Sequence, residues 1–322
     1  MVHFLFDMPL EELEVCQLPQ NKPADLDVFW ERMLERSANQ PLHATSQPLA
    51  YSVPTVRVDQ IGFDAFDGGR IEGWFIAPAQ GSGPFPTLIF HHGYSWNRGK
   101  IADYLLWVLQ GFACLSVDVR GQGGESTDHA AYPGGHGPGW LTQGILEPDQ
   151  YYLSRTYVDT VRAIDYTCTR PEVDANRIGM SGLSQGGGLS LAACCLDSRP
   201  ALCMPEVPAF GHFERTLTIT RAAPWDHLYH YLRVNPQYIE PAMATLRYVE
   251  LNNLAERIQC PTIVSVALSD DICIPSTIYT VYNRIPVNVK ELDYFPFSGH
   301  DAGLNREKQI IWARRHLLSE NL

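Results

Sequence analysis

A serine between two glycines, where an apolar run gives way to a helical pattern, constrains this chain more than any other feature. The pentapeptide at residues 182–186 reads G-L-S-Q-G; an apolar run at 177–180 precedes it and small residues at 188–195 follow it. In a sharp turn from a buried strand to a helix, a Cβ at either glycine would collide with neighbouring backbone. The turn also strains the serine backbone and holds the hydroxyl clear of the chain. We therefore predict that Ser184 is a nucleophile on such a turn.

Length and charge limit the classes of protein to consider. The chain has 322 residues, enough for one large core, and a net charge of −12 from 24 basic and 36 acidic residues. No run of lysine or arginine occurs, so we expect no nucleic-acid partner. An acidic surface favours solubility and says little about the substrate.

Cysteine usage and the absence of targeting patterns predict the compartment. The eight cysteines are scattered without C-x-x-C spacing, as expected for buried small hydrophobes in a reducing compartment. Residues 1–14 contain Asp7 and three glutamates and no basic region, so they do not resemble a signal peptide. No apolar run approaches the length of a membrane span. We expect a cytoplasmic protein without a membrane partner.

Strand and helix patterns alternate almost from end to end and predict a single α/β domain over residues 1–322, with a mostly parallel sheet covered by helices on both faces. Residues 1–50 are read as an N-terminal extension and 210–255 as a helical insertion near the site. The predicted strands are 56–61 and 70–77, an antiparallel pair at the sheet edge, then 87–92, 113–119, 177–180, 201–207, 262–268 and 290–295. The predicted helices are 25–36, 101–109, 149–169 and 305–318, and a long glycine-rich loop covers 120–144.

A serine nucleophile needs a base to take its proton and a carboxylate to orient that base. In the α/β-hydrolase arrangement these partners follow the serine in the order acid, histidine, each on a loop after a core strand. Asp270 and Asp271 follow strand 262–268, and His300 follows strand 290–295. The sequence therefore predicts an α/β-hydrolase fold and an esterase-type triad of Ser184, Asp270 and His300. Asp270 is favoured over Asp271 because it is nearer the strand end, and one of the two can cap the helix near residue 276.

The negative oxygen of the tetrahedral intermediate needs hydrogen-bond donors. One expected donor is the backbone N–H of Gln185, directly after the nucleophile, and the other is that of Tyr94, in the loop after strand 87–92. His91 and His92 suggest metal ligands, but adjacent residues on a strand point to opposite faces. We therefore expect neither a metal nor a cofactor.

The loop after strand 113–119 reads Arg120-Gly-Gln122. A phosphate cradle is one reading, but the lysine of a P-loop is missing. A buried Arg120 that braces the active-site loops is the favoured alternative, with Gln122 in the same supporting role. His136 and Trp140 are expected to order the long loop.

These residues together resemble carbohydrate esterase family 7, the acetyl xylan esterase and cephalosporin C deacetylase group. The resemblance runs nearly end to end and is carried by residues 4–13, Phe29-Trp30, His92-Gly93-Tyr94, Arg120-Gly121-Gln122, 135–146, Ser184-Gln185-Gly186-Gly187-Gly188, Phe213-Glu214-Arg215, Asp270 and Pro275-Ser276-Thr277. It implies removal of acetyl groups from acetylated xylo-oligosaccharides, other acetylated sugars and cephalosporin C. It also implies a cytoplasmic homohexamer, a dimer of trimers, with active sites facing a central cavity.

Two positions depart from the family pattern. Asp301 stands where the family has glutamate after the catalytic histidine, and residues 205–210 lack the aspartate that relatives carry. Both departures concern the pocket and the substrate preference rather than the triad. Two other functions are compatible with the fold: a prolyl-oligopeptidase-like peptidase, for which the chain has no propeller domain, and a non-catalytic binding protein, which would be expected to lack a triad residue.

Overall fold

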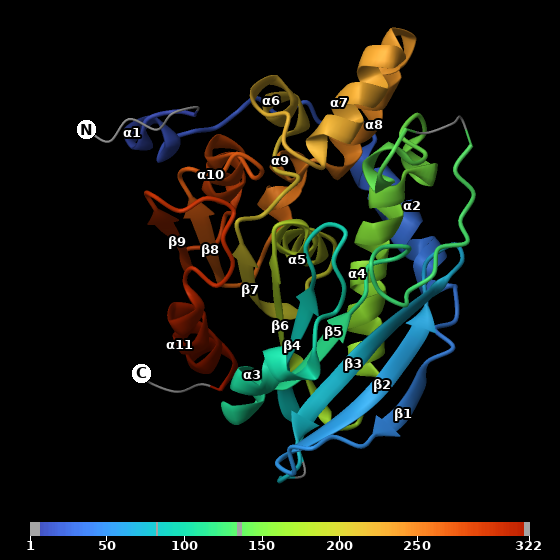
Figure 1. Ribbon diagram of the computed structural model, residues 1–322, viewed down its shortest axis with the longest axis vertical. Helices are drawn as coiled ribbons and strands as arrows, with labels where there is room; N and C mark the ends of the chain where they lie inside the picture. Colours follow the sequence, from blue (N-terminus) through green and yellow to red (C-terminus); the bar gives the residue numbers. More distant parts are fainter. Residues whose placement is uncertain (1–6, 82, 134–136, 319–322) are drawn as a thin grey trace.

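A mixed sheet of nine strands forms the centre of the computed structural model, which describes residues 7–81, 83–133 and 137–318 (Figure 1). The strand order is β1-β2-β3-β5-β4-β6-β7-β8-β9, and all pairs from β5 to β9 are parallel. The strands are β1 (Thr45–Leu49), β2 (Val56–Asp64), β3 (Arg70–Pro78), β4 (Phe85–His91), β5 (Ala113–Val117), β6 (Val173–Leu183), β7 (Pro200–Glu206), β8 (Thr262–Ala267) and β9 (Lys290–Phe295). The predicted α/β-hydrolase fold is confirmed.

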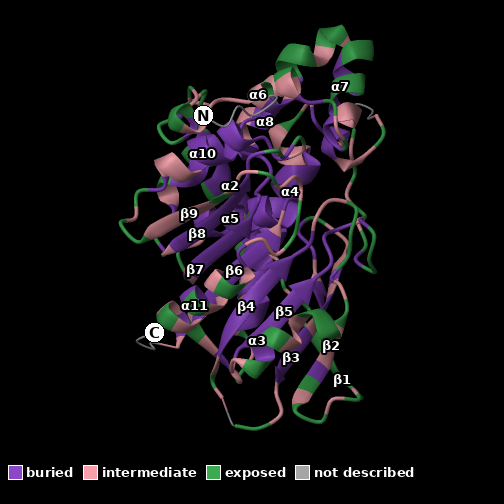
Figure 2. Ribbon diagram, turned by 60° about the vertical axis from the view of Figure 1, so that its left-hand side comes forward, coloured by how far each residue is buried: buried purple, intermediate pink, exposed green. Residues whose placement is uncertain are grey.

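Helices cover both faces of the sheet, which explains the continuous apolar strands. Leu88 and Phe90 of β4 point into a cluster with Trp107 and Trp312, whereas Ile89 between them points into the larger cluster on the opposite face. The first cluster lies under α3 (Leu105–Leu109) and α11 (Arg306–Leu317), and the larger one under α4 (Tyr152–Cys168) and α5 (Gln185–Leu196). Figure 2 shows the resulting layer of buried strands, with the largely buried α4 and α5 on one face and the partly exposed α3 and α11 on the other.

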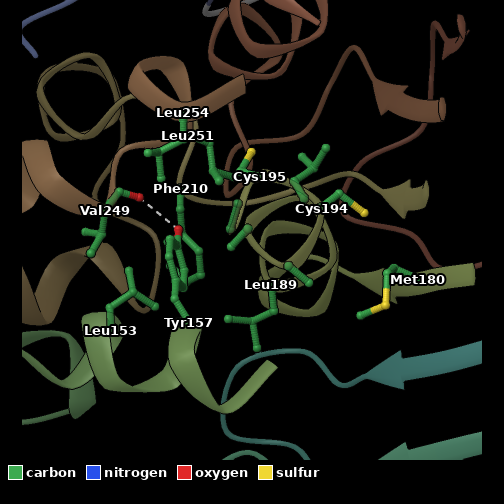
Figure 3. Packing of buried hydrophobic residues seen from close by; sticks show 14 of the residues in the cluster. Leu153, Tyr157, Met180, Leu189, Cys194, Cys195, Phe210, Val249, Leu251 and Leu254 are labelled. Atoms are coloured by element: carbon green, nitrogen blue, oxygen red, sulfur yellow. Dashed lines mark hydrogen bonds between the residues drawn. The ribbon is translucent and has the colours of Figure 1, made fainter. Parts of the chain in front are cut away.

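Helix α5 is almost completely enclosed in the larger cluster, because all of its residues except the last are buried. Figure 3 shows Leu189 and Cys195 of this helix on the side of Tyr157 of α4, and Cys194 on the side away from it. The Tyr157 hydroxyl donates a hydrogen bond of 2.8 Å to the Val249 carbonyl oxygen. The helix that follows Ser184 is therefore held between the sheet, α4 and the insertion.

The edge of the sheet differs from the prediction. Strands β2 and β3 pair antiparallel as expected, but β1 adds outside β2, with Thr45 opposite Gly62 and Leu49 opposite Val58. The prediction that β2 and β3 form the edge was therefore wrong. All five residues of β1 are exposed, so the strand lacks the alternation of apolar and polar residues that reveals half-buried strands.

Residues 210–255 form short helices above the carboxyl ends of the parallel strands (Figure 1). They are α6 (Phe213–Ile219), α7 (Trp225–Val234), α8 (Ile239–Val249) and α9 (Leu251–Leu254). The remaining helices of four or more residues outside the insertion are α1 (Leu10–Leu13), α2 (Leu26–Ala38), η1 (Ile101–Tyr104) and α10 (Pro275–Arg284). No helix within the described ranges is both long and apolar enough to cross a membrane. The eight cysteines are all free, and seven of them are buried.

Candidate active site

Ser184 lies on the sharp turn between β6 and α5, with φ 59° and ψ −118°. The glycines on either side are required by the packing. A Cβ on Gly186 would lie 1.9 Å from the His91 carbonyl oxygen, and one on Gly182 would lie 2.5 Å from the same atom. Since L-residues rarely adopt positive φ, the strained serine is a sign of a functional turn. The strand-to-helix turn predicted from the G-x-S-x-G motif is present.

Asp270 and His300 are brought together at the carboxyl ends of β8 and β9. His300 Nδ1 lies 2.8 Å from Asp270 Oδ2. The other carboxylate oxygen accepts the backbone N–H groups of Ile272 and Cys273, each at 2.8 Å, and Asp270 is fully buried. Asp271 is exposed. The geometry thus places Asp270, and not its neighbour, against the imidazole.

The start of α10 is capped from a distant part of the chain. Asp7 Oδ2 accepts the Ser276 N–H at 2.7 Å, and Asp7 Oδ1 lies 2.8 Å from the Arg215 guanidinium. A carboxylate there satisfies a free helix N–H and interacts favourably with the helix dipole. Neither Asp270 nor Asp271 provides this cap.

Ser184 and His300 line the same cavity, which has a volume of about 610 Å³. Ser184 Oγ lies 3.8 Å from Cys273 Sγ, and within the described residues it makes no hydrogen bond to His300. Hydrogen bonds of this kind are often long without substrate and tighten when it binds. Two of the predicted triad residues, Ser184 and His300, therefore share one cavity, and the buried Asp270 already contacts His300.

The expected oxyanion donors lie at two neighbouring loops. Gln185 is the first residue of α5, so its N–H has no acceptor inside the helix, and Tyr94 follows β4 and also lines the cavity. Gln122 connects the two loops: its side-chain amide exchanges hydrogen bonds of 2.9 and 3.0 Å with the Gln185 amide, and its Oε1 accepts the Ser95 N–H at 2.9 Å. This link fixes the distance between the two candidate donors.

The Tyr94 side chain has a role separate from that of its backbone N–H, because it contacts the long loop. Its hydroxyl accepts the Trp140 N–H at 2.8 Å, and burial raises the pKa of Tyr94 to about 12. The indole N–H of Trp140 donates to the Gly121 carbonyl oxygen at 3.0 Å. Trp140 therefore connects the long loop to the candidate oxyanion loop. His136, predicted to order the same loop, lies outside the described residues.

Arg120 is completely buried and faces Asp159. Its Nε and Nη2 atoms lie 2.6 and 2.9 Å from the two carboxylate oxygens, and Nη2 also donates to the Phe66 carbonyl oxygen at 2.5 Å. Burial opposes the charge on Arg120, but the Asp159 carboxylate outweighs it and raises the pKa of Arg120. The guanidinium is thus engaged with Asp159 and Phe66 inside the protein, which agrees with the bracing role and not with a phosphate cradle.

His91 and His92 do not converge on one point. His92 Nε2 accepts the Val119 N–H at 2.8 Å and its Nδ1 lies 2.8 Å from the Gly93 carbonyl oxygen, so the ring is neutral. Burial lowers the pKa of His91 to about 3. Over the part of the chain that the structure describes, the one cluster with metal-ligand spacing is Asp270, Cys273 and His300, which overlaps the candidate triad.

Sequence reasoning missed a second buried carboxylate at the site. Glu206 ends β7, and its carboxylate accepts the Gly303 N–H at 2.6 Å and lies 3.0 Å from Arg306 Nη2. Its backbone oxygen accepts the Ser184 N–H at 2.9 Å. Glu206 therefore connects the serine turn to the loop that carries His300. The signal was available, because a carboxylate at the end of a buried apolar strand needs a partner.

Comparison with known proteins gives the same assignment over nearly the whole chain. Residues 3–316 match the family model "Acetyl xylan esterase (AXE1)". The structure resembles the acetyl xylan esterase from Paenibacillus sp. R4, with 38% identity, a TM-score of 0.93 and coverage of 96% of this chain and 100% of that chain. It also resembles acetyl xylan esterase 1 from Thermoanaerobacterium sp. JW/SL YS485, with 30% identity, a TM-score of 0.89 and coverage of 98% and 99%.

A curated relative extends the comparison. The acetyl esterase Axe7A of Xylanibacter ruminicola is 28% identical over 313 residues, which are 92% of this chain and 67% of the relative. The fold, the family match and these relatives agree on one enzyme class. The chain belongs to the acetyl xylan esterase family, carbohydrate esterase family 7, and is a carboxylic ester hydrolase, a serine hydrolase built on the α/β-hydrolase fold.

Proposed function

We propose that this enzyme removes acetyl groups from small oxygen esters through an acetyl-enzyme on Ser184. The observation that carries the proposal is the buried Asp270 carboxylate 2.8 Å from Nδ1 of His300, which lines the same cavity as the strained Ser184. The substrates are acetylated xylo-oligosaccharides, other acetylated sugars and cephalosporin C. Family membership supports this substrate class.

In the proposed reaction Ser184 Oγ attacks the acetyl carbon while His300 Nε2 takes the hydroxyl proton. Asp270 holds the Nδ1–H tautomer and stabilises the imidazolium that forms. The Tyr94 and Gln185 amides hold the oxyanion, and His300 returns the proton to the leaving alcohol. A water molecule then attacks the acetyl carbon while His300 takes its proton; the bond to Ser184 Oγ breaks, His300 gives the proton to Oγ, and acetate leaves. Side chains, backbone N–H groups and water supply every group that the reaction needs, so we propose no cofactor.

The assembly and the cellular location are part of the proposal. The resemblance to carbohydrate esterase family 7 supports a cytoplasmic homohexamer, a dimer of trimers with its active sites around a central cavity. Such an assembly would admit acetylated oligosaccharides and exclude polymeric xylan. Sedimentation of the purified chain tests it, because a monomer would contradict the proposed hexamer.

Replacement of Ser184 by alanine tests the nucleophile. We expect kcat on p-nitrophenyl acetate to fall by roughly 10⁴-fold or more, since only binding and the oxyanion donors remain. An acyl series from acetate to butyrate on one alcohol tests the acyl preference, and acetate should be preferred. More than a trace of activity in a folded Ser184→Ala variant would contradict the assignment.

A further inference from the structure

Trp96 lines the catalytic cavity yet remains largely exposed. Its side chain is 67% exposed, and it shares the cavity wall with Ser184 and His300. An indole buries a large apolar area when a partner covers it. This indole therefore has room for an occupant in the cavity that Ser184 and His300 also line.

The loop that carries Trp96 is held in place from several directions. Ser95 has a φ of 59°, a strained value, and its N–H donates to Gln122. The Trp96 N–H donates to the Gly93 carbonyl oxygen at 3.1 Å, and a Cβ on Gly123 would lie 2.7 Å from the carbonyl oxygens of both Ser95 and Trp96. The indole is presented by a fixed backbone, so little order is lost when a ligand binds.

The same loop is anchored on its other side. The Arg98 N–H donates to Asp118 Oδ1 at 2.6 Å, and Arg98 Nη1 lies 3.0 Å from Asp118 Oδ2. Both side chains are buried. Trp96 thus projects from a short segment that is fixed at both ends, and strain held in such a segment points to a function.

The chemistry of the cavity wall indicates an uncharged occupant. The described lining residues include Trp96, Trp140 and Tyr94 and contain no aspartate, glutamate, lysine or arginine. His227 adds polar ring nitrogens, of which Nδ1 is buried and has no hydrogen-bond partner among the described residues. Apolar walls with a few polar groups fit a neutral ligand that has one apolar face and several hydroxyl groups. A pyranose ring has this character.

We propose that Trp96 is a stacking platform for the sugar ring on the alcohol side of the ester. This inference rests on the proposed function and goes further, because it assigns the selection of sugar acetates over simple alkyl acetates to one side chain. The C–H face of the ring covers the indole while the acetyl group reaches Ser184. Trp96 is a specificity-determining residue and takes no part in the chemical step.

The test compares a sugar ester with an alkyl ester. For Trp96→Ala we expect the ratio of kcat/KM on tetra-acetyl xylopyranose to that on ethyl acetate to fall about tenfold, mainly through KM on the sugar ester. Trp96→Phe keeps an aromatic face and should restore most of the ratio. Tyr229→Ala is the matched control, because Tyr229 is an exposed aromatic residue of α7 that does not line the cavity; its ratio should equal that of the wild type.

Other outcomes would overturn the inference in distinct ways. An unchanged ratio in Trp96→Ala, or an equal loss on both esters, removes the stacking role. If Trp96→Ala sediments as a smaller assembly than the wild type, Trp96 belongs to a contact between subunits instead. Wild-type hydrolysis of ethyl acetate without hydrolysis of the sugar ester also contradicts this inference but leaves the esterase intact. If the wild type hydrolyses neither ester, the proposed function fails.

Discussion

Loops at the carboxyl ends of the parallel strands form one side of the catalytic cavity, and the insertion at residues 210–255 forms the other. On the strand side, Ser184 and Asp270 are buried and positioned by backbone hydrogen bonds. On the insertion side, Ala223, Pro224 and His227 line the cavity. The helices behind them expose apolar side chains at Tyr229, Val234 and Ile239.

The two sides therefore tolerate change differently. Main-chain geometry fixes the strand side, because register and turn conformation determine where each group lies. Side-chain packing fixes the insertion side, and one link is the Trp225 indole N–H, which donates to the Ile272 carbonyl oxygen at 2.7 Å. We expect changes on the strand side to abolish the reaction and changes on the insertion side to alter stability or substrate preference.

Replacement of the buried acid should have the largest effect. In Asp270→Asn the amide no longer favours the Nδ1–H tautomer of His300, so kcat on p-nitrophenyl acetate should fall by roughly 10³–10⁴-fold. Asp271→Asn is the matched control and should stay within about twofold of the wild type, since its side chain is exposed. A larger loss in Asp271→Asn than in Asp270→Asn would reverse the assignment of the acid.

A methyl group at the serine turn should be the next most damaging change. In Gly186→Ala the new Cβ would meet the His91 carbonyl oxygen, a backbone atom of β4, at 1.9 Å. We expect the free energy of unfolding to fall by about 4 kcal/mol, or the variant not to fold at all. Gly111→Ala is a comparison with a positive φ but nothing within 4 Å of the added atom, so strain alone should cost less there. Equal losses in urea denaturation would show that steric overlap is not the cause.

A buried carboxyl on the insertion side should control stability rather than catalysis. Burial raises the pKa of Glu250 from 4.5 to about 8. Between these values the unfolded state has released a proton that the folded state still holds, so stability falls as the pH rises through this window. Glu250→Gln cannot ionise and should unfold with a free energy on the order of 2 kcal/mol higher than the wild type at pH 9, and equal to it near pH 4.

Chemical denaturation at several pH values measures this difference, and kcat should change little. The Phe213 N–H, which donates to Glu250 Oε2 at 3.1 Å, can donate to the glutamine oxygen instead. A gain that does not vary with pH would show that ionisation of Glu250 is not its source. A loss of kcat comparable to that of Asp270→Asn would break the contrast between the two sides.

Sequence patterns predicted the parts of the molecule that depend on local order along the chain. Continuous apolar runs located β4, β5 and β8, and the loops after β8 and β9 supplied Asp270 and His300 in the expected order. The contact between Asp270 and His300 could be expected because parallel strands end at one edge of the sheet. The glycines at 182 and 186 likewise identified the turn.

Contacts that depend on distant pairing left no such pattern. Strand β1 is fully exposed. Asp7 contacts Ser276, and Cys273 contacts Ser184, only after the chain has folded. The packing of the insertion over the cavity follows from tertiary contacts such as Trp225 with Ile272 rather than from helical periodicity. The exposure of Trp96 was not predicted either, because tryptophan is highly buried on average and no local pattern marks an exposed one.

The Asp7 cap has a consequence for how the enzyme matures on the ribosome. Asp7 and Ser276 are separated by 269 positions. At about 5–20 residues per second, Asp7 emerges roughly 10–50 s before the helix that it caps has been translated. The helix that follows the candidate acid Asp270 therefore has no cap until residues 269 positions apart have both been synthesised and have met. A protease or a chaperone that engages the residues around Asp7 during this interval would delay formation of the cap.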